Sequence, residues 1–98
     1  MSPRKRNRSP QGQHLPALRQ QIDRIDLRLL RVLNQRAALA LRVGRLKQQR
    51  GLPVFDGRRE GAILRQVVSA NPGPLPAQAV RAIYREILRQ IRRLERSV

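Results

Sequence analysis

The chain has 98 residues, a formal net charge of +16 at pH 7 and no cysteine. This length suffices for one small domain that gains stability from oligomerisation, and the lack of cysteine excludes a disulfide framework and thiolate chemistry. No apolar run reaches the roughly 18 residues of a membrane span and no signal-peptide core precedes the domain, so we expect a cytoplasmic protein without membrane contact.

Residues 1–13 (MSPRKRNRSPQGQ) combine Pro, Ser, Gly and Gln with four basic residues and have no apolar periodicity. This composition predicts a disordered basic tail. The tail is either solvated or serves as an arm that binds a polyanion. We therefore place the folded helical domain at residues 14–98.

The stretch from Leu15 to about Arg50 has the three- and four-residue spacing of a helix. Its seam positions are Leu15, Leu18, Ile22, Ile25, Leu29, Val32, Arg36, Leu39, Val43 and Leu46. Such a helix would be roughly 54 Å long, whereas a compact domain of about 100 residues has a radius of gyration near 13 Å. We therefore expect another chain to cover the helix.

Two shorter helices are predicted after it. Gly51 suits the C-cap of the long helix and Pro53 prevents its continuation, while Asp56 suits the N-cap of a helix from about Gly57 to Ala70. After a loop at 71–76, a third helix carries the apolar positions Val80, Ile83, Ile87, Ile91, Leu94 and Val98. No stretch alternates like a strand, so the predicted fold class is all-α with one very long, one short and one medium helix.

Arg36 and Lys47 are the candidate binding residues of the long helix. Arg36 interrupts the apolar seam, where a charge is costly unless something anionic meets it, and Lys47 is one of only two lysines among 22 basic residues. At 100° per residue the two share a face, roughly 16 Å apart along the axis, which suits a small dianion between them. Arg19 is about 25 Å from Arg36 and turned by about 100°, so it could join that site only from an antiparallel partner helix.

Glu60 and Glu95, two of the six acidic residues, are further candidate site residues. A capping box after Asp56 would place its acid at Arg59, so capping does not explain Glu60. The simpler alternative is that both acids pair with nearby arginines on the surface, for example Glu95 with Arg92, and that the cations are merely solvated. The residues alone otherwise predict an oligomeric helical protein with a buried cationic pocket.

The sequence resembles the all-α (AroQ-type) chorismate mutases. The resemblance covers Leu15 to about Glu95 and rests on the run LRQQIDRIDLRLLRVLNQRAALALRVGRLKQQRGLPVFDGRREGAIL and on IYREILRQIRRLE. Its motifs include the G..K step at Gly44 and Lys47, the D..RE junction and the YREI run. It implies an intertwined homodimer with two active sites that converts chorismate to prephenate by a [3,3]-sigmatropic rearrangement, towards phenylalanine and tyrosine.

The resemblance also implies roles for individual residues. Arg36 and a partner chain's Arg19 would clamp the two substrate carboxylates with bidentate geometry, and Lys47 would donate to the ether oxygen of the breaking bond. Glu95 would face the same oxygen, and must then be protonated to donate. Catalysis would come from conformational restraint and electrostatic stabilisation, with no nucleophile, cofactor or metal ion.

The junction motif supplies Asp56, Arg59 and Glu60 as further substrate-binding residues, with Glu60 accepting from the ring hydroxyl. Two departures from the family pattern stand nearby. Ile91 occupies a position where many relatives have a small polar residue that contacts a carboxylate, and Gly57 loosens the turn after Asp56.

Three rival functions remain. Some proteins of this fold are isochorismate-pyruvate lyases with a similar cationic cage. The charge of +16 also allows a basic helical nucleic-acid-binding protein, although 2% aromatic residues give no stacking platform and no helix-turn-helix is indicated. A helical dimerisation module would leave Arg36 and Lys47 unexplained. A chorismate mutase could work alone or with an activating partner enzyme.

Overall fold

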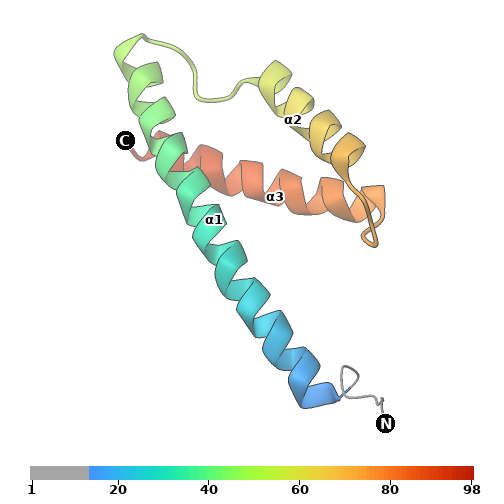
Figure 1. Cartoon of the computed structure of the whole chain (residues 1–98). Helices are drawn as coiled ribbons and strands as arrows, with labels where there is room; N and C mark the ends of the chain where they lie inside the picture. Colours follow the sequence, from blue (N-terminus) through green and yellow to red (C-terminus); the bar gives the residue numbers. More distant parts are fainter. Residues whose placement is uncertain (1–13) are drawn as a thin grey trace. The chain divides into compact units, whose positions relative to one another are not determined.

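The computed structural model describes residues 14–98, so the tail predicted at 1–13 lies outside the described part. Three helices make up this part: α1 (Leu15–Gln49), α2 (Gly57–Ala70) and α3 (Ala77–Arg96) (Figure 1). Between residues 14 and 98 there is no strand, which confirms the all-α prediction. A search of the same residues finds no helix with the length and apolarity that a membrane crossing requires.

The helix ends follow the local signals in the sequence. Gly51 has φ of 66°, the left-handed conformation that glycine adopts readily, and the backbone N–H of Leu52 donates to the carbonyl of Lys47 at 2.8 Å. At the start of α2, Oδ1 of Asp56 accepts from the backbone N–H of Arg59 at 3.0 Å. The predicted C-cap and N-cap are therefore both confirmed.

The chain divides into two compact units, residues up to Arg36 and residues from Ala37 to Val98. The described part of the first unit is the N-terminal portion of α1. Its apolar seam is open to solvent, since more than half of the surface of each of the following side chains is exposed: Leu15, Ile22, Ile25, Leu29 and Val32. A helix segment with an uncovered apolar seam is the kind of surface that another chain buries.

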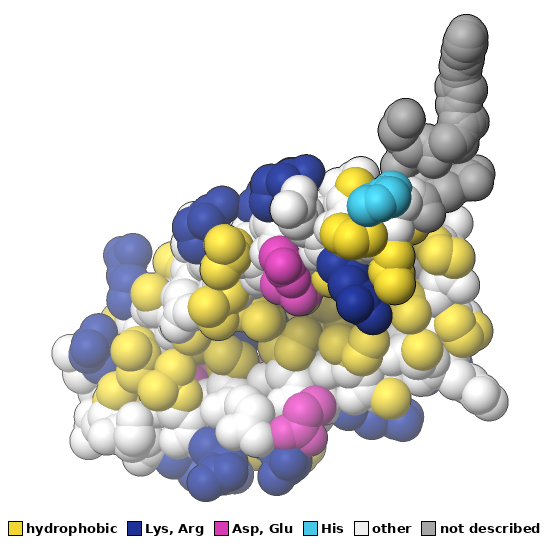
Figure 2. All heavy atoms as spheres, turned by 90° about the horizontal axis from the view of Figure 1, so that it is seen from below, with side chains coloured by type: hydrophobic (Ala, Val, Ile, Leu, Met, Phe, Trp, Pro, Cys, Tyr) yellow, Lys and Arg dark blue, Asp and Glu magenta, His cyan; other side chains and the backbone are white. Residues whose placement is uncertain are grey.

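The second unit contains the rest of α1 together with α2 and α3. The helices α2 and α3 lie side by side and antiparallel (Figure 1), and the buried apolar residues are Ala40, Val80 and Leu88. Several large apolar side chains of this unit are nevertheless exposed, among them Leu39, Val43, Leu46 and Ile83. Figure 2, which shows the whole chain from one side, also has hydrophobic side chains (yellow) at the surface, with Lys and Arg side chains (dark blue) among them.

Gly44 lies at a close approach between the backbones of α1 and α3. It is buried, and a Cβ atom at this position would lie 3.1 Å from the carbonyl oxygen and 3.2 Å from the Cα of Glu95. Backbone atoms cannot rotate away as a flexible side chain does, so the crossing depends on the missing Cβ. Glycine at this position thus sets how closely the Glu95 end of α3 approaches α1.

Candidate functional site

Lys47 lies in the last turn of α1 and forms the centre of the candidate site. Its Nζ atom donates to the backbone carbonyl of Val54 at 2.7 Å and lies 3.4 Å from Oε1 of Glu95. The side chains of Lys47 and Glu95 are 20% and 11% exposed, so the pair is largely withdrawn from water. An ammonium has three donors, and these two partners leave one for a ligand.

The position of Glu95 excludes one of the interpretations drawn from the sequence. The alternative in which Glu95 pairs with Arg92 on the helix surface is wrong, because the Glu95 carboxylate points inward to Lys47. The close crossing at Gly44 explains this placement, since Gly44 is one helical turn before Lys47 and faces the backbone of Glu95. A donor and a carboxyl group are thus held side by side.

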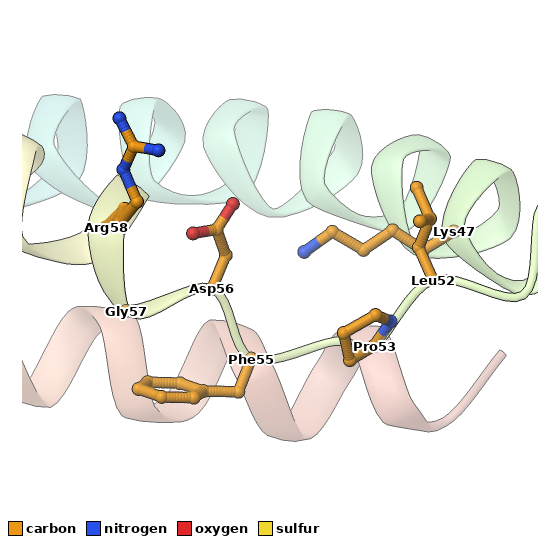
Figure 3. Close-up of a pocket in the computed structure, with 7 residues that line it drawn as sticks. All are labelled: Lys47, Leu52, Pro53, Phe55, Asp56, Gly57 and Arg58. Atoms are coloured by element: carbon orange, nitrogen blue, oxygen red, sulfur yellow. The ribbon is translucent and has the colours of Figure 1, made fainter.

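A pocket of about 320 Å³ adjoins Lys47 (Figure 3). This volume falls within the range of small-molecule sites. In Figure 3 the Lys47 side chain extends from α1 toward Asp56, and Arg58 stands at the far end. The lining residues are Lys47, Leu52, Pro53, Phe55, Asp56, Gly57 and Arg58.

The junction before α2 gives a mixed result for the predicted site residues. Asp56 lines the pocket, while its Oδ1 atom also caps the helix. Arg59 is exposed and is not among the residues that line the pocket, whereas the neighbouring Arg58 is. Substrate binding by Arg59 stays a prediction.

Glu60 pairs with an arginine, as the simpler interpretation of the sequence expected, but the partner is the largely buried Arg92 of another helix rather than a neighbour on the surface. Its Oε1 atom is 2.5 Å from Nη1 of Arg92 in α3, and the two side chains are 18% and 24% exposed. The guanidinium of Arg92 also lies over the ring of Phe55, with 5.3 Å from Cζ to the ring centre. The inward position of Arg92 follows from helical periodicity, because Arg92 is one turn after Leu88, which is buried.

The two arginines predicted to bind carboxylates lie in the first unit, on the N-terminal portion of α1. Arg36 is half-buried and Arg19 is exposed. Among residues 14–98 the ion pairs are Lys47 with Glu95, Arg89 with Glu86 and Arg92 with Glu60, so neither Arg19 nor Arg36 has a carboxylate partner in this part of the chain.

The Arg89 and Glu86 pair is a useful contrast to the site. It lies on the exposed surface of α3, with 54% and 53% of the two side chains exposed. The hydrogen bond from Arg89, with a second from Gln90, lowers the pKa of the Glu86 carboxyl. Exposed pairs of this kind contribute little to stability, so breaking this pair is a suitable control for breaking a buried one.

A prediction on stability follows from the crossing at Gly44. Gly44→Ala should lower the free energy of unfolding, because overpacking a tight contact typically costs about 1–3 kcal/mol and exceeds the helix-propensity gain of up to about 1 kcal/mol. Gly61→Ala is the matched control, since a Cβ at Gly61 in α2 would meet only the flexible end of Arg65, at 3.3 Å. Urea unfolding should give a lower free energy of unfolding than the wild type for Gly44→Ala and a higher one for Gly61→Ala. Equal stabilisation by the two substitutions would mean that the crossing tolerates a Cβ.

Comparison with known proteins adds to this geometry. The family described as chorismate mutase type II matches residues 18–96. Among curated proteins, the chain is 39% identical over 90 residues to the bifunctional chorismate mutase/prephenate dehydratase of Aquifex aeolicus and 40% identical over 78 residues to that of Neisseria gonorrhoeae. These matches cover 88% and 80% of this chain but 25% and 21% of the relatives, so the chain spans about a quarter of their length.

A solved structure is similar over nearly its whole length. Chorismate mutase (Form II) from Thermus thermophilus superposes with a TM-score of 0.84 at 36% sequence identity. The match covers 86% of this chain and 96% of that chain. The similarity therefore includes all three helices rather than a local fragment.

Proposed function

The chain belongs to the chorismate mutase type II family, and on that basis we propose that it isomerises chorismate to prephenate. The observation that carries the proposal is the Lys47 ammonium, fixed by Val54 and Glu95 beside a pocket of small-molecule size. In this rearrangement the ether C–O bond breaks while a C–C bond forms within one molecule. The enzyme supplies no nucleophile, so its task is to hold the reactive conformer and stabilise the transition state.

Lys47 stabilises the charge that grows on the ether oxygen. Because the Val54 carbonyl and Glu95 already hold its ammonium, the donor needs little reorganisation during the reaction, which is what electrostatic catalysis requires. Glu95 faces the same oxygen and donates a hydrogen bond in its protonated form. Glu60 accepts a hydrogen bond from the ring hydroxyl, while Asp56 and Arg59 complete the binding residues of the junction.

The two substrate carboxylates are bound by arginines from two chains. Arg36 acts from the chain that holds Lys47, and the partner's Arg19 acts from the antiparallel helix of a homodimer. The exposed apolar seam of α1 supports this assembly, because a second copy of the chain would bury it. Two facing guanidinium groups match a dicarboxylate through bidentate hydrogen bonds.

A prediction on pH follows from the role of Glu95. Activity should be lower at alkaline pH, because the ionised form of a carboxyl group only accepts hydrogen bonds. Glu95→Gln keeps a donor that does not titrate and should flatten the alkaline limb. The measurement is kcat/KM for both proteins from about pH 5 to 9, a range that begins just above the usual values for carboxyl groups and extends to alkaline pH. Parallel profiles would show that Glu95 is not the donor.

The proposed activity is tested by giving the purified protein chorismate and isochorismate in separate assays. We expect chorismate to disappear, followed by ultraviolet absorbance, with prephenate as the product. Release of pyruvate from isochorismate without loss of chorismate would identify the lyase instead. We also predict activation by a partner enzyme and a cytoplasmic location, and these two predictions need experiments other than assays of the purified protein.

A further inference from the structure

The guanidinium of Arg92 contacts both a carboxylate and an aromatic ring. Nη1 lies 2.5 Å from Oε1 of Glu60, and Cζ lies 5.3 Å from the centre of the Phe55 ring. Both charged side chains are less than a quarter exposed. Charge-assisted hydrogen bonds withdrawn from solvent are stronger than surface ion pairs, and the ring face attracts the cation further.

Gly57 makes room for this arrangement. A Cβ atom at Gly57 would lie 3.3 and 3.4 Å from two carbon atoms of the Phe55 ring, so a larger residue would push the ring away. In Figure 3 the ring of Phe55 lies alongside α3. Phe55 and Gly57 both line the pocket that contains Lys47. The Arg92 cluster, defined as Arg92, Glu60, Phe55 and Gly57, therefore adjoins the candidate site.

The ion pair occupies only one oxygen of Glu60. Arg92 donates to Oε1, and within residues 14–98 no protein donor contacts Oε2. A carboxylate can accept several hydrogen bonds, so Oε2 is able to accept one from a ligand while Oε1 stays bound. A glutamate has three rotatable side-chain bonds, and the bond to Arg92 removes most of that freedom.

We propose that Arg92 is a positioning residue that fixes the Glu60 side chain so that its second oxygen accepts the hydrogen bond of the substrate ring hydroxyl. This inference rests on the proposed function. Arg92 itself touches no substrate atom. Its effect reaches the reaction through Glu60, and the loss of such orientation by a small displacement costs up to about a hundredfold in rate.

The test compares chorismate with an analogue in which hydrogen replaces the ring hydroxyl. Arg92→Met, which keeps most of the side-chain volume without charge, should lower kcat/KM for chorismate by about tenfold and leave that for the analogue nearly unchanged. In a Glu60→Ala background the same substitution should have no further effect on chorismate, because the two residues act as one unit. Arg92→Lys should recover part of the loss.

Arg89→Met is the matched control, because it breaks the exposed pair with Glu86 on the same helix, and it should leave the ratio of the two kcat/KM values unchanged. If Arg92→Met fails to fold, Phe55→Leu removes the supporting ring and should lower the same ratio. An equal loss for both substrates would overturn the inference and leave only a structural contact between α2 and α3. A wild-type protein inactive on chorismate would instead refute the proposed function itself.

Discussion

Replacing Lys47 with alanine is expected to lower kcat by about a hundredfold or more, because removing one preorganised donor to a developing oxyanion has effects of that size. The ammonium is held by the Val54 carbonyl at 2.7 Å and by Glu95 at 3.4 Å. The substitution should leave the helices intact, since Lys47 is in the last turn of α1. The measurement is kcat at saturating chorismate, with circular dichroism to verify the fold.

Lys47→Arg should also fail, because a planar guanidinium cannot take the place of a compact point donor. Arg45→Ala provides a control, since Arg45 is an exposed cation two residues earlier and thus on the opposite side of the helix. It should keep kcat close to that of the wild type. An unchanged kcat in Lys47→Ala would remove the lysine from the mechanism.

The second large effect concerns the carboxylate clamp. Arg36→Ala and Arg19→Ala should each lower kcat/KM by roughly thirtyfold or more, because truncating one side of a desolvated charge pair costs at least about 2 kcal/mol. The loss should appear largely in KM, since the carboxylates are bound in both ground and transition states. Arg31→Ala is the control, because Arg31 is exposed and turned by about 120° from Arg19 and about 140° from Arg36. A wild-type kcat/KM in either arginine variant would remove that residue from the site.

The helices and their ends could be predicted because their causes are local. The apolar spacing gives α1, Gly51 ends it, and Asp56 begins α2 through a hydrogen bond to a backbone N–H three residues away. Lys47 could be selected because lysine is scarce in this sequence, and the structure places it beside the pocket. Arg36 was selected as a charge within an apolar seam, and its role stays a prediction. Each of these signals needs only the nearest turns of the chain.

The remaining features depend on packing between distant segments. The pairing of Glu60 with Arg92 depends on the register of α2 against α3, and the contact of Arg92 with the Phe55 ring depends on the path of the preceding loop; helical periodicity specifies neither. The importance of Gly44 likewise appears only when the backbone of Glu95 is 3.1 Å away. The sequence motif contained Gly44, yet no physical reason for glycine was apparent before the crossing was seen.

The most direct test of the account is to mix the Arg19→Ala and Arg36→Ala proteins under conditions of subunit exchange. If each site takes Arg36 from one chain and Arg19 from the other, a mixed dimer has one intact site. Random exchange should then restore about a quarter of the wild-type activity per chain, as expected for a two-fold symmetric dimer. If no activity returns although subunit exchange is verified, Arg36 of one chain and Arg19 of the other do not form one site. This result would contradict the composite site.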